Sequence, residues 1–213
     1  MSGAAIVVTA AWILAAYLLG ATPFGLIIGK LNGIDIREVG SGNIGATNVW
    51  RSVGKAWGLA AFFCDFMKGL LPVLLARIVA SHWPSLALPA WLPLASGIAA
   101  VAGHLFPVWL GFKGGKGIAT GFGMLVGLTP VLVLTAFGLF VVTVAISRYI
   151  SLGSLVAAVF LAIAAWPLHF CGMLGFQRDI PLCVFIMVLS LFAIWKHKSN
   201  IKRLCEGREN RFF

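Results

Sequence analysis

Long apolar stretches alternate with short polar segments along the 213 residues of the chain. Stretches near 20 residues match the roughly 30 Å hydrocarbon layer of a bilayer at about 1.5 Å per helical residue. The pattern therefore predicts an all-α integral membrane protein, a polytopic bundle of about seven transmembrane helices. We expect these helices at residues 4–29, 57–80, 88–110, 118–128, 131–147, 152–170 and 180–196.

The segment 117–147 is the difficult part of this pattern. A single helix there would be about 45 Å long, too long for one upright span. Gly127 and Pro130 supply a turn in its middle, so we predict two short helices. Short helices favour local bilayer thinning or a water-filled cavity, which an enzyme with a water-soluble substrate needs.

Composition supports the membrane assignment, since 61% of the residues are hydrophobic and 10% are charged. No long polar linker divides the chain, so we expect one domain over residues 1–213. The first apolar stretch is too long for a signal-peptide core and lacks a basic segment before it, which favours a retained helix. Glycines inside the predicted helices, such as Gly54, Gly58, Gly69, Gly97 and Gly103, favour close helix packing.

The net charge of +10 is distributed unevenly. Basic residues follow the first, third and last apolar stretches, whereas only Arg77 and Arg178 fall near the opposite ends. The positive-inside rule places the N-terminus outside and the C-terminus in the cytoplasm. Topology alone explains most of the basic C-terminal cluster, but it does not explain the glycines and asparagines beside the other charges.

Two glycine-rich segments have a composition suited to phosphate. Residues 111–117 read Gly-Phe-Lys-Gly-Gly-Lys-Gly, and residues 40–48 read Gly-Ser-Gly-Asn-Ile-Gly-Ala-Thr-Asn, followed by Arg51. Glycines expose backbone N–H groups, and an arginine can bind a phosphate through two parallel hydrogen bonds. The first segment is not a Walker A loop, because Leu110 stands where the first glycine belongs and Gly117 follows the lysine. An ordinary loop rich in turn formers is the alternative for residues 40–48.

Other polar residues stand at helical spacings. Asp65 and Lys68 lie three apart within a predicted span, which favours a structural ion pair supporting the first loop. His104 by itself indicates a buried, hydrogen-bonded histidine. The four cysteines are far apart, so we expect neither a zinc site nor a disulfide framework. We also expect no other metal and no cofactor.

Two further sets of polar residues lie at the ends of the last two predicted helices. Arg148, Ser151 and Ser154 open the helix at 152–170, where Ser151 can act as an N-cap and the N-terminus can attract an anion. A plain cap with a topogenic arginine is the alternative. His197, Asn200 and Arg203 share one face if the last helix continues.

Three motifs follow one another along the chain. The first is residues 40–48 with Arg51, Asp65 and Lys68-Gly69. The second is residues 103–109, Gly-His-Leu-Phe-Pro-Val-Trp, with 112–117. The third is residues 197–204, His-Lys-Ser-Asn-Ile-Lys-Arg-Leu, with Glu206-Gly207. In sequence and in order, these motifs resemble the three signatures of the bacterial acyl-phosphate-dependent glycerol-3-phosphate acyltransferase family.

The resemblance implies a multi-pass enzyme of phospholipid biosynthesis in the bacterial cytoplasmic (inner) membrane, with its active site facing the cytoplasm. It implies transfer of a long-chain acyl group from acyl phosphate to the 1-hydroxyl of sn-glycerol 3-phosphate. Lysophosphatidate and phosphate are the implied products, with the lipid bilayer as the surroundings and no nucleic acid as partner. The chain lacks an H-x4-D pair, since Trp109 stands at that position after His104, and it lacks G-x-S-x-G. Direct transfer without an acyl-enzyme is therefore favoured.

We expect the three polar patches to converge at the inner leaflet. Ser41, Asn43, Thr47 and the Gly114 and Gly115 amides are predicted to bind the acyl-phosphate head, and Asn48 is predicted to bind substrate beside them. Phosphate binding is predicted for Arg51, Lys113 or Lys116, and Arg148, with Ser151 and Ser154. His197 and Asn200 are predicted to orient the glycerol, and the proton leaves to the donor phosphate or to His197. Asp65, Lys68 and His104 are expected to support the structure of the site. A transporter of a phosphorylated solute and a membrane scaffold are the competing classes.

Overall fold

The computed structural model describes residues 2–171 and 180–212, and these residues form helices and connecting segments without a strand. The chain divides into two compact units, Met1–Leu128 and Thr129–Phe213. The expectation of one domain stays a prediction. Arg178 lies outside the described residues.

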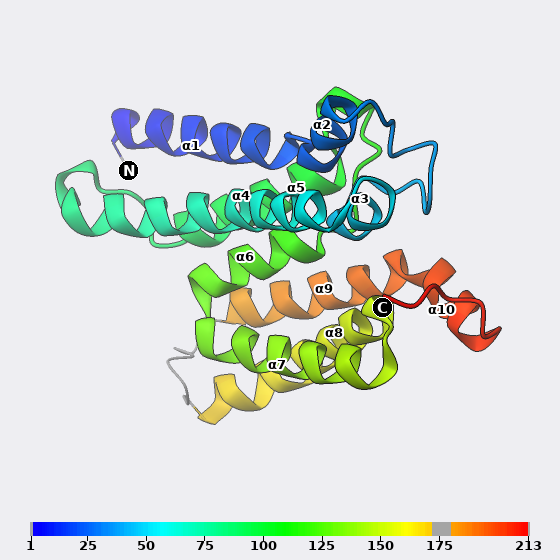
Figure 1. Cartoon of the computed structure of the whole chain (residues 1–213). Helices are drawn as coiled ribbons and strands as arrows, with labels where there is room; N and C mark the ends of the chain where they lie inside the picture. The colour runs from blue at the N-terminus through cyan, green and yellow to red at the C-terminus, as the bar shows by residue number, and fades with distance from the viewer. Residues whose placement is uncertain (1, 172–179, 213) are drawn as a thin grey trace. The chain divides into compact units, whose positions relative to one another are not determined.

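Unit 1 contains six α-helices and two short 3-10 helices within its described residues (Figure 1). Helix α4 packs against α3, α5 and α6, while α1 packs against α5. The bounds are α1 Gly3–Ala21, α2 Phe24–Leu31, α3 Ala46–Ser52, α4 Lys55–His82, η1 Pro84–Leu86, α5 Leu92–Leu105, η2 Val108–Leu110 and α6 Ile118–Leu128.

Helices α4 and α6 touch through a reciprocal pair of glycines. A Cβ on Gly69 would lie 2.0 Å from the Thr120 carbonyl oxygen, and a Cβ on Gly123 would lie 2.0 Å from the Phe66 carbonyl oxygen. Each helix therefore supplies one glycine that lets the partner's backbone approach. The prediction that glycines serve packing is confirmed here.

The α1–α5 contact uses the same arrangement. A Cβ on Gly20 would lie 2.1 Å from the Ala100 carbonyl oxygen, and one on Gly103 would lie 2.2 Å from the Tyr17 carbonyl oxygen. Gly54 differs from this group, because it precedes α4 with φ of +140° and has nothing within 4 Å of an added Cβ. Its role is conformational and not one of packing.

The first predicted helix is interrupted. Helix α1 ends at Ala21 and α2 begins at Phe24, because Pro23 has no N–H to donate and its ring opposes a continuous helix. The apolar pattern continues through the break and conceals it. The Lys68 ammonium donates to the Thr22 carbonyl at 2.9 Å, so a side chain of α4 satisfies a backbone acceptor left by the break.

Unit 2 contains four helices among its described residues, α7 Pro130–Ser147, α8 Ile150–Cys171, α9 Ile180–Lys196 and α10 Lys198–Cys205. Helix α8 packs against α7 and α9 (Figure 1). The predicted division of 117–147 is confirmed, since α6 ends at Leu128 and α7 begins at Pro130. Between α9 and α10 the chain bends by 54°.

Within residues 2–171 and 180–212, five helical segments are long and apolar enough to cross a bilayer. The bent α9–α10 pair is a sixth, and the 11-residue α6 is a shorter apolar helix. The predicted count of about seven includes α6. The orientation of the termini stays a prediction. The five are Gly3–Ala21, Lys55–His82, Leu92–Leu110, Pro130–Ser147 and Ile150–Pro167.

Candidate functional site

The loop between α2 and α3 is held by a buried asparagine at the start of α3. The Asn48 side-chain oxygen accepts from the Ser41 N–H at 2.9 Å, and its amide donates to the Ile36 carbonyl at 2.7 Å and the Val39 carbonyl at 3.2 Å. Both amide protons of Asn48 are thus used on backbone carbonyls. Asn48 therefore fixes the backbone that carries Ser41, and its predicted role in substrate binding stays a prediction.

Ser41 lies at an exposed tip between two glycines in the left-handed region, Gly40 with φ +60° and Gly42 with φ +66°. A Cβ on Gly40 would lie 2.3 Å from the Asn48 side-chain oxygen, so glycine is required both for conformation and for space. The two glycines therefore give the loop the conformation that leaves Ser41 exposed at its tip.

Residues from Ala46 onward form helix α3 and not the loop that the composition suggested. The Asn43 side-chain oxygen accepts from the Gly45 N–H at 2.8 Å and fixes the turn that enters the helix. Thr47 and Arg51 lie four residues apart on α3, so they share one face. Arg51 is exposed at the surface of unit 1.

The glycine-rich segment at residues 111–117 folds back onto the end of α5. The Gly114 N–H donates to the Leu105 carbonyl at 3.1 Å, and the Gly115 N–H donates to the His104 carbonyl at 3.1 Å. Both donors are used on helix carbonyls, and the expectation that these two amides bind an acyl phosphate stays a prediction. Their donation satisfies acceptors at a helix C-terminus.

The glycines in this segment are explained by space. A Cβ on Gly114 would lie 2.0 Å from the His104 carbonyl oxygen, and a Cβ on Gly115 would lie 2.3 Å from His104 Nε2. The segment turns at Gly111 and Phe112, both in the left-handed region. The two predicted phosphate ligands differ in burial, since Lys113 is exposed and Lys116 is half-buried.

Asp65, Lys68 and His104 form a buried cluster, each no more than 5% exposed. Lys68 Nζ lies 2.7 Å from Asp65 Oδ1, and His104 Nδ1 lies 3.8 Å from the same oxygen. The predicted Asp65–Lys68 pair is confirmed, and it holds the α1–α2 break through the Thr22 contact. His104 is buried as expected, and Gly115 packs closely against its ring.

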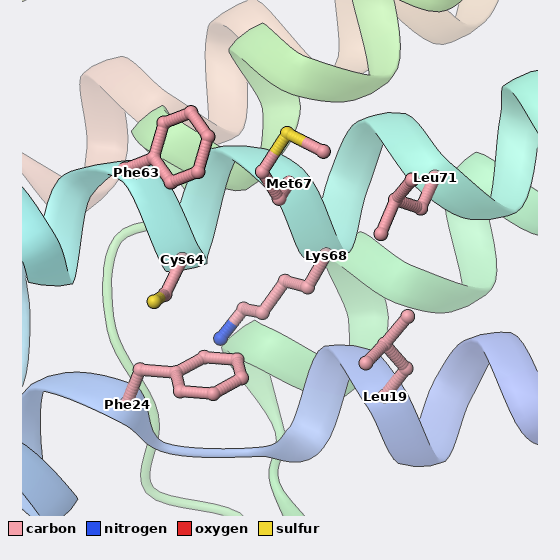
Figure 2. A pocket seen from close by; sticks show the side chains of 7 residues that line it. All are labelled: Leu19, Phe24, Phe63, Cys64, Met67, Lys68 and Leu71. Carbon is pink, nitrogen blue, oxygen red and sulfur yellow. The ribbon is translucent and has the colours of Figure 1, made fainter.

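An apolar cavity of about 150 Å³ opens beside this cluster, with Lys68 as its charged lining residue. Figure 2 shows the Lys68 side chain reaching toward Phe24, whose ring centroid is 5.7 Å from Nζ. The ammonium is engaged by the Asp65 carboxylate, the Thr22 carbonyl and this ring, so the cavity is not an anion site. Its lining residues are Leu19, Phe24, Phe63, Cys64, Met67, Lys68 and Leu71.

In unit 2 the polar residues gather on one carboxylate. Glu209 Oε1 accepts from the Ser151 hydroxyl at 2.8 Å and from the Asn200 amide at 2.7 Å, and Oε2 accepts from Arg203 Nε at 2.7 Å. Glu209 is 9% exposed. Burial favours the neutral acid, but the hydrogen bonds and the Arg203 charge outweigh it and lower the pKa of Glu209.

Sequence reasoning missed Glu209. The signal available was the scarcity of acidic residues, six in the whole chain, since a carboxylate in a strongly basic tail needs a structural reason. The structure brings together two predicted residues, Ser151 and Asn200, through this unpredicted third one. Helix α8 begins at Ile150, so Ser151 lies inside its first turn and is not its N-cap.

His197 stands at the bend between α9 and α10 and is 4% exposed. Its Nδ1 lies 2.8 Å from the Ala193 carbonyl oxygen, which can only accept, so Nδ1 carries the proton. The neutral ring therefore has an unprotonated Nε2. The helix does not continue straight through His197, so the predicted common face is limited to Asn200 and Arg203 on α10.

The remaining predicted residues of unit 2 lie at the junction of α7 and α8. Arg148 ends α7 in the left-handed region with φ +66°, and its carbonyl accepts from the Phe212 N–H at 2.7 Å. Ser154 is 6% exposed and lies three residues after Ser151 on α8. Unit 1 holds the other predicted residues, and the expected convergence of the three patches stays a prediction.

Sequence comparison places these motifs in a family. A family model described as glycerol-3-phosphate acyltransferase matches residues 10–207. The chain belongs to this family. Similar curated members come from Geobacter sulfurreducens, 46% identical over 92% of this chain and 94% of the relative, and from Aquifex aeolicus, 40% identical over 92% and 95%.

The family likeness extends to solved structures. The glycerol 3-phosphate form of PlsY (YgiH), an integral membrane glycerol 3-phosphate acyltransferase, matches with a TM-score of 0.81 and 38% identity over 96% of both chains. The lysophosphatidic acid form matches with a TM-score of 0.78 and 38% identity over 96% of this chain and 95% of that one. The chain is therefore an all-helical, multi-pass integral membrane protein of the PlsY type.

Proposed function

We propose that this protein transfers an acyl group from acyl phosphate to the 1-hydroxyl of sn-glycerol 3-phosphate. The hydroxyl oxygen attacks the carbonyl carbon, the bond from that carbon to the phosphate oxygen breaks, and 1-acyl-glycerol 3-phosphate and inorganic phosphate leave. Likeness to the glycerol 3-phosphate form of PlsY over 96% of both chains carries the proposal. Acyl phosphate is the proposed donor because the three motifs resemble the acyl-phosphate-dependent family, and the lack of an H-x4-D pair and of G-x-S-x-G favours direct transfer without an acyl-enzyme.

An acyl phosphate is an activated mixed anhydride, so positioning and charge stabilisation supply much of the catalysis. Ser41, presented between two left-handed glycines, is assigned to the donor head group with Asn43 and Thr47. Arg51 and the lysines Lys113 and Lys116 are assigned to phosphate, as is Arg148. The glycines 114 and 115 act by admitting a close turn over His104, since their N–H groups donate to helix carbonyls.

His197 and Asn200 are assigned to the acceptor glycerol. The Nδ1–H of His197 is fixed on the Ala193 carbonyl, so Nε2 of the neutral ring is the nitrogen able to accept the hydroxyl proton. The alternative acceptor of that proton is the donor phosphate itself. Substantial turnover by His197→Ala would eliminate the histidine-base route and leave the substrate-assisted one.

The deciding experiment uses the full-length protein in lipid vesicles with acyl phosphate and glycerol 3-phosphate. Lysophosphatidate and inorganic phosphate are expected in equal amounts, with no product from acyl-CoA or acyl-carrier protein. Ser41→Ala is expected to abolish turnover, while the matched Ser81→Ala, at the exposed end of α4, is expected to retain it. Uptake of glycerol 3-phosphate without acyl transfer would instead support a transporter.

Arg51 supplies a second, kinetic test. Arg51→Gln is expected mainly to raise the KM for glycerol 3-phosphate, because a guanidinium that binds phosphate contributes before the chemical step. An unchanged KM would refute this assignment. We place the enzyme in the bacterial inner membrane with its site on the cytoplasmic side, and labelling of single cysteines in the loop at residues 40–45 from either side tests that placement.

A further inference from the structure

The junction of α9 and α10 holds two cations beside an exposed aromatic ring. Trp195 is 55% exposed, and its ring centroid lies 5.6 Å from Lys196 Nζ and 5.3 Å from Lys198 Nζ. The Lys196 ammonium also lies 5.5 Å from the Phe192 ring centroid. These are cation–π distances, so both ammonium groups contact the indole ring.

Helix α10 continues this cationic surface. Lys198 and Lys202 lie one helical turn apart and are both exposed. The buried side of the same helix carries Asn200 and Arg203, which contact Glu209. The helix therefore has one face committed to the interior of unit 2 and another that presents ammonium groups outward.

Within the part of the chain that the structure describes, the charges of Lys198 and Lys202 are not neutralised by a neighbouring carboxylate. The two carboxylates that follow α10 are committed elsewhere, Glu206 to Arg208 and Glu209 to Arg203. Among the described residues, no ion pair joins Lys198 or Lys202 to a carboxylate. Such a face attracts an anion from outside the protein.

The position of this face identifies the anion. Exposed apolar side chains on α9, Val188 at 54% and Leu191 at 56%, lead along the helix to Trp195. Tryptophan is enriched at the level of lipid head groups, with lysines next to it in the aqueous layer. This surface is apolar, then aromatic, then cationic. The same order is found in a bilayer leaflet, where the lipid tails are followed by the interface and then by the charged head groups.

We propose that Trp195, Lys198 and Lys202 form a binding surface for anionic phospholipid head groups of the surrounding bilayer. Each lysine near an anionic membrane surface favours its lipids by on the order of fivefold. Because α10 also carries Asn200, lipid bound here holds in place a helix that we assign to the acceptor glycerol. That second step rests on the proposed function, whereas lipid binding does not.

Lipid contact at Trp195 can be measured directly in nanodiscs. Brominated lipids quench tryptophan at short range, and the difference between wild type and Trp195→Phe isolates Trp195 from the other tryptophans. We expect this difference to be larger for brominated phosphatidylglycerol than for brominated phosphatidylcholine, by several-fold. The K198Q/K202Q variant should lose the preference, and K198R/K202R should retain it.

The matched control is K30Q/K55Q, which removes two exposed charges from unit 1 and should keep the preference. No preference in the wild type would overturn the proposal, as would equal loss in K30Q/K55Q, which would indicate a net-charge effect. Loss of the preference on adding glycerol 3-phosphate or inorganic phosphate would also overturn it, because the face would then bind soluble phosphate. A lipid preference without acyl transfer would leave this proposal standing while the proposed function fails.

Discussion

The side-chain amide of Asn200 donates to the carboxylate of Glu209 at 2.7 Å, joining a residue of α10 to the segment that follows it. Ser151 of α8 donates to the same oxygen at 2.8 Å. A predicted acceptor-binding residue is therefore oriented by a carboxylate that also contacts the neighbouring helix. Glu209 is a positioning residue in our proposal.

Replacement of Glu209 tests this role. Glu209→Gln keeps the size of the side chain but removes its charge, and charge-assisted hydrogen bonds contribute about 1.5–3 kcal/mol each. We expect kcat to fall by about tenfold or more, since about 1.4 kcal/mol corresponds to a factor of ten. The matched variant Glu206→Gln, at an exposed pair with Arg208, should remain near wild type. Equal activities of the two variants would contradict the positioning role.

The lowered pKa of Glu209 predicts how stability depends on pH. A carboxyl group with a lower pKa in the folded chain binds fewer protons there than in the unfolded chain. Its contribution is complete above the ordinary value of 4.5 and is lost as the pH falls below that value toward the folded pKa. The measurement is thermal unfolding from pH 6 downward, with Glu209→Gln as reference. Parallel curves for the two proteins would show that Glu209 does not contribute.

The close approach of Gly115 to His104 predicts a steric effect. Gly115→Ala would place a Cβ 2.3 Å from His104 Nε2, and overpacking of this kind costs about 1–3 kcal/mol. We expect a lower unfolding temperature. Adding His104→Ala should relieve part of the loss, giving a non-additive double-mutant cycle. Gly138→Ala in α7, where nothing lies within 4 Å, should be neutral or stabilising.

The buried pair Asp65–Lys68 predicts a different pattern of losses. Lys68→Met leaves a buried carboxylate without its partner and should destabilise unit 1 by about 3–5 kcal/mol. The double variant D65N/K68M removes both charges and should recover much of that stability. Unfolding in detergent measures the stabilities, and turnover per folded protein measures activity. A double variant that is as stable as wild type but inactive would show that the pair takes part in the chemistry.

Hydrophobic pattern was sufficient to predict most of the helical fold, including the bounds of Ile118–Leu128 and Ile180–Lys196. It could not reveal the break at Pro23, because apolar residues continue on both sides and hydropathy does not report backbone geometry. The family motifs identified the glycines at 114 and 115, yet spacing alone could not show that their N–H groups donate to α5. Glu209 was missed because its partners lie on different elements, which the sequence separates.

The reciprocal glycine contacts of α1 with α5 and of α4 with α6 have a consequence for work outside the native bilayer. Where two backbones touch directly, neither a lipid tail nor a detergent chain can enter between them. The spacing of these helices is consequently set by van der Waals shape and not by the amphiphile that surrounds the protein. Extraction into detergent should replace the lipids around unit 1, while the spacing and register of both helix pairs should stay the same.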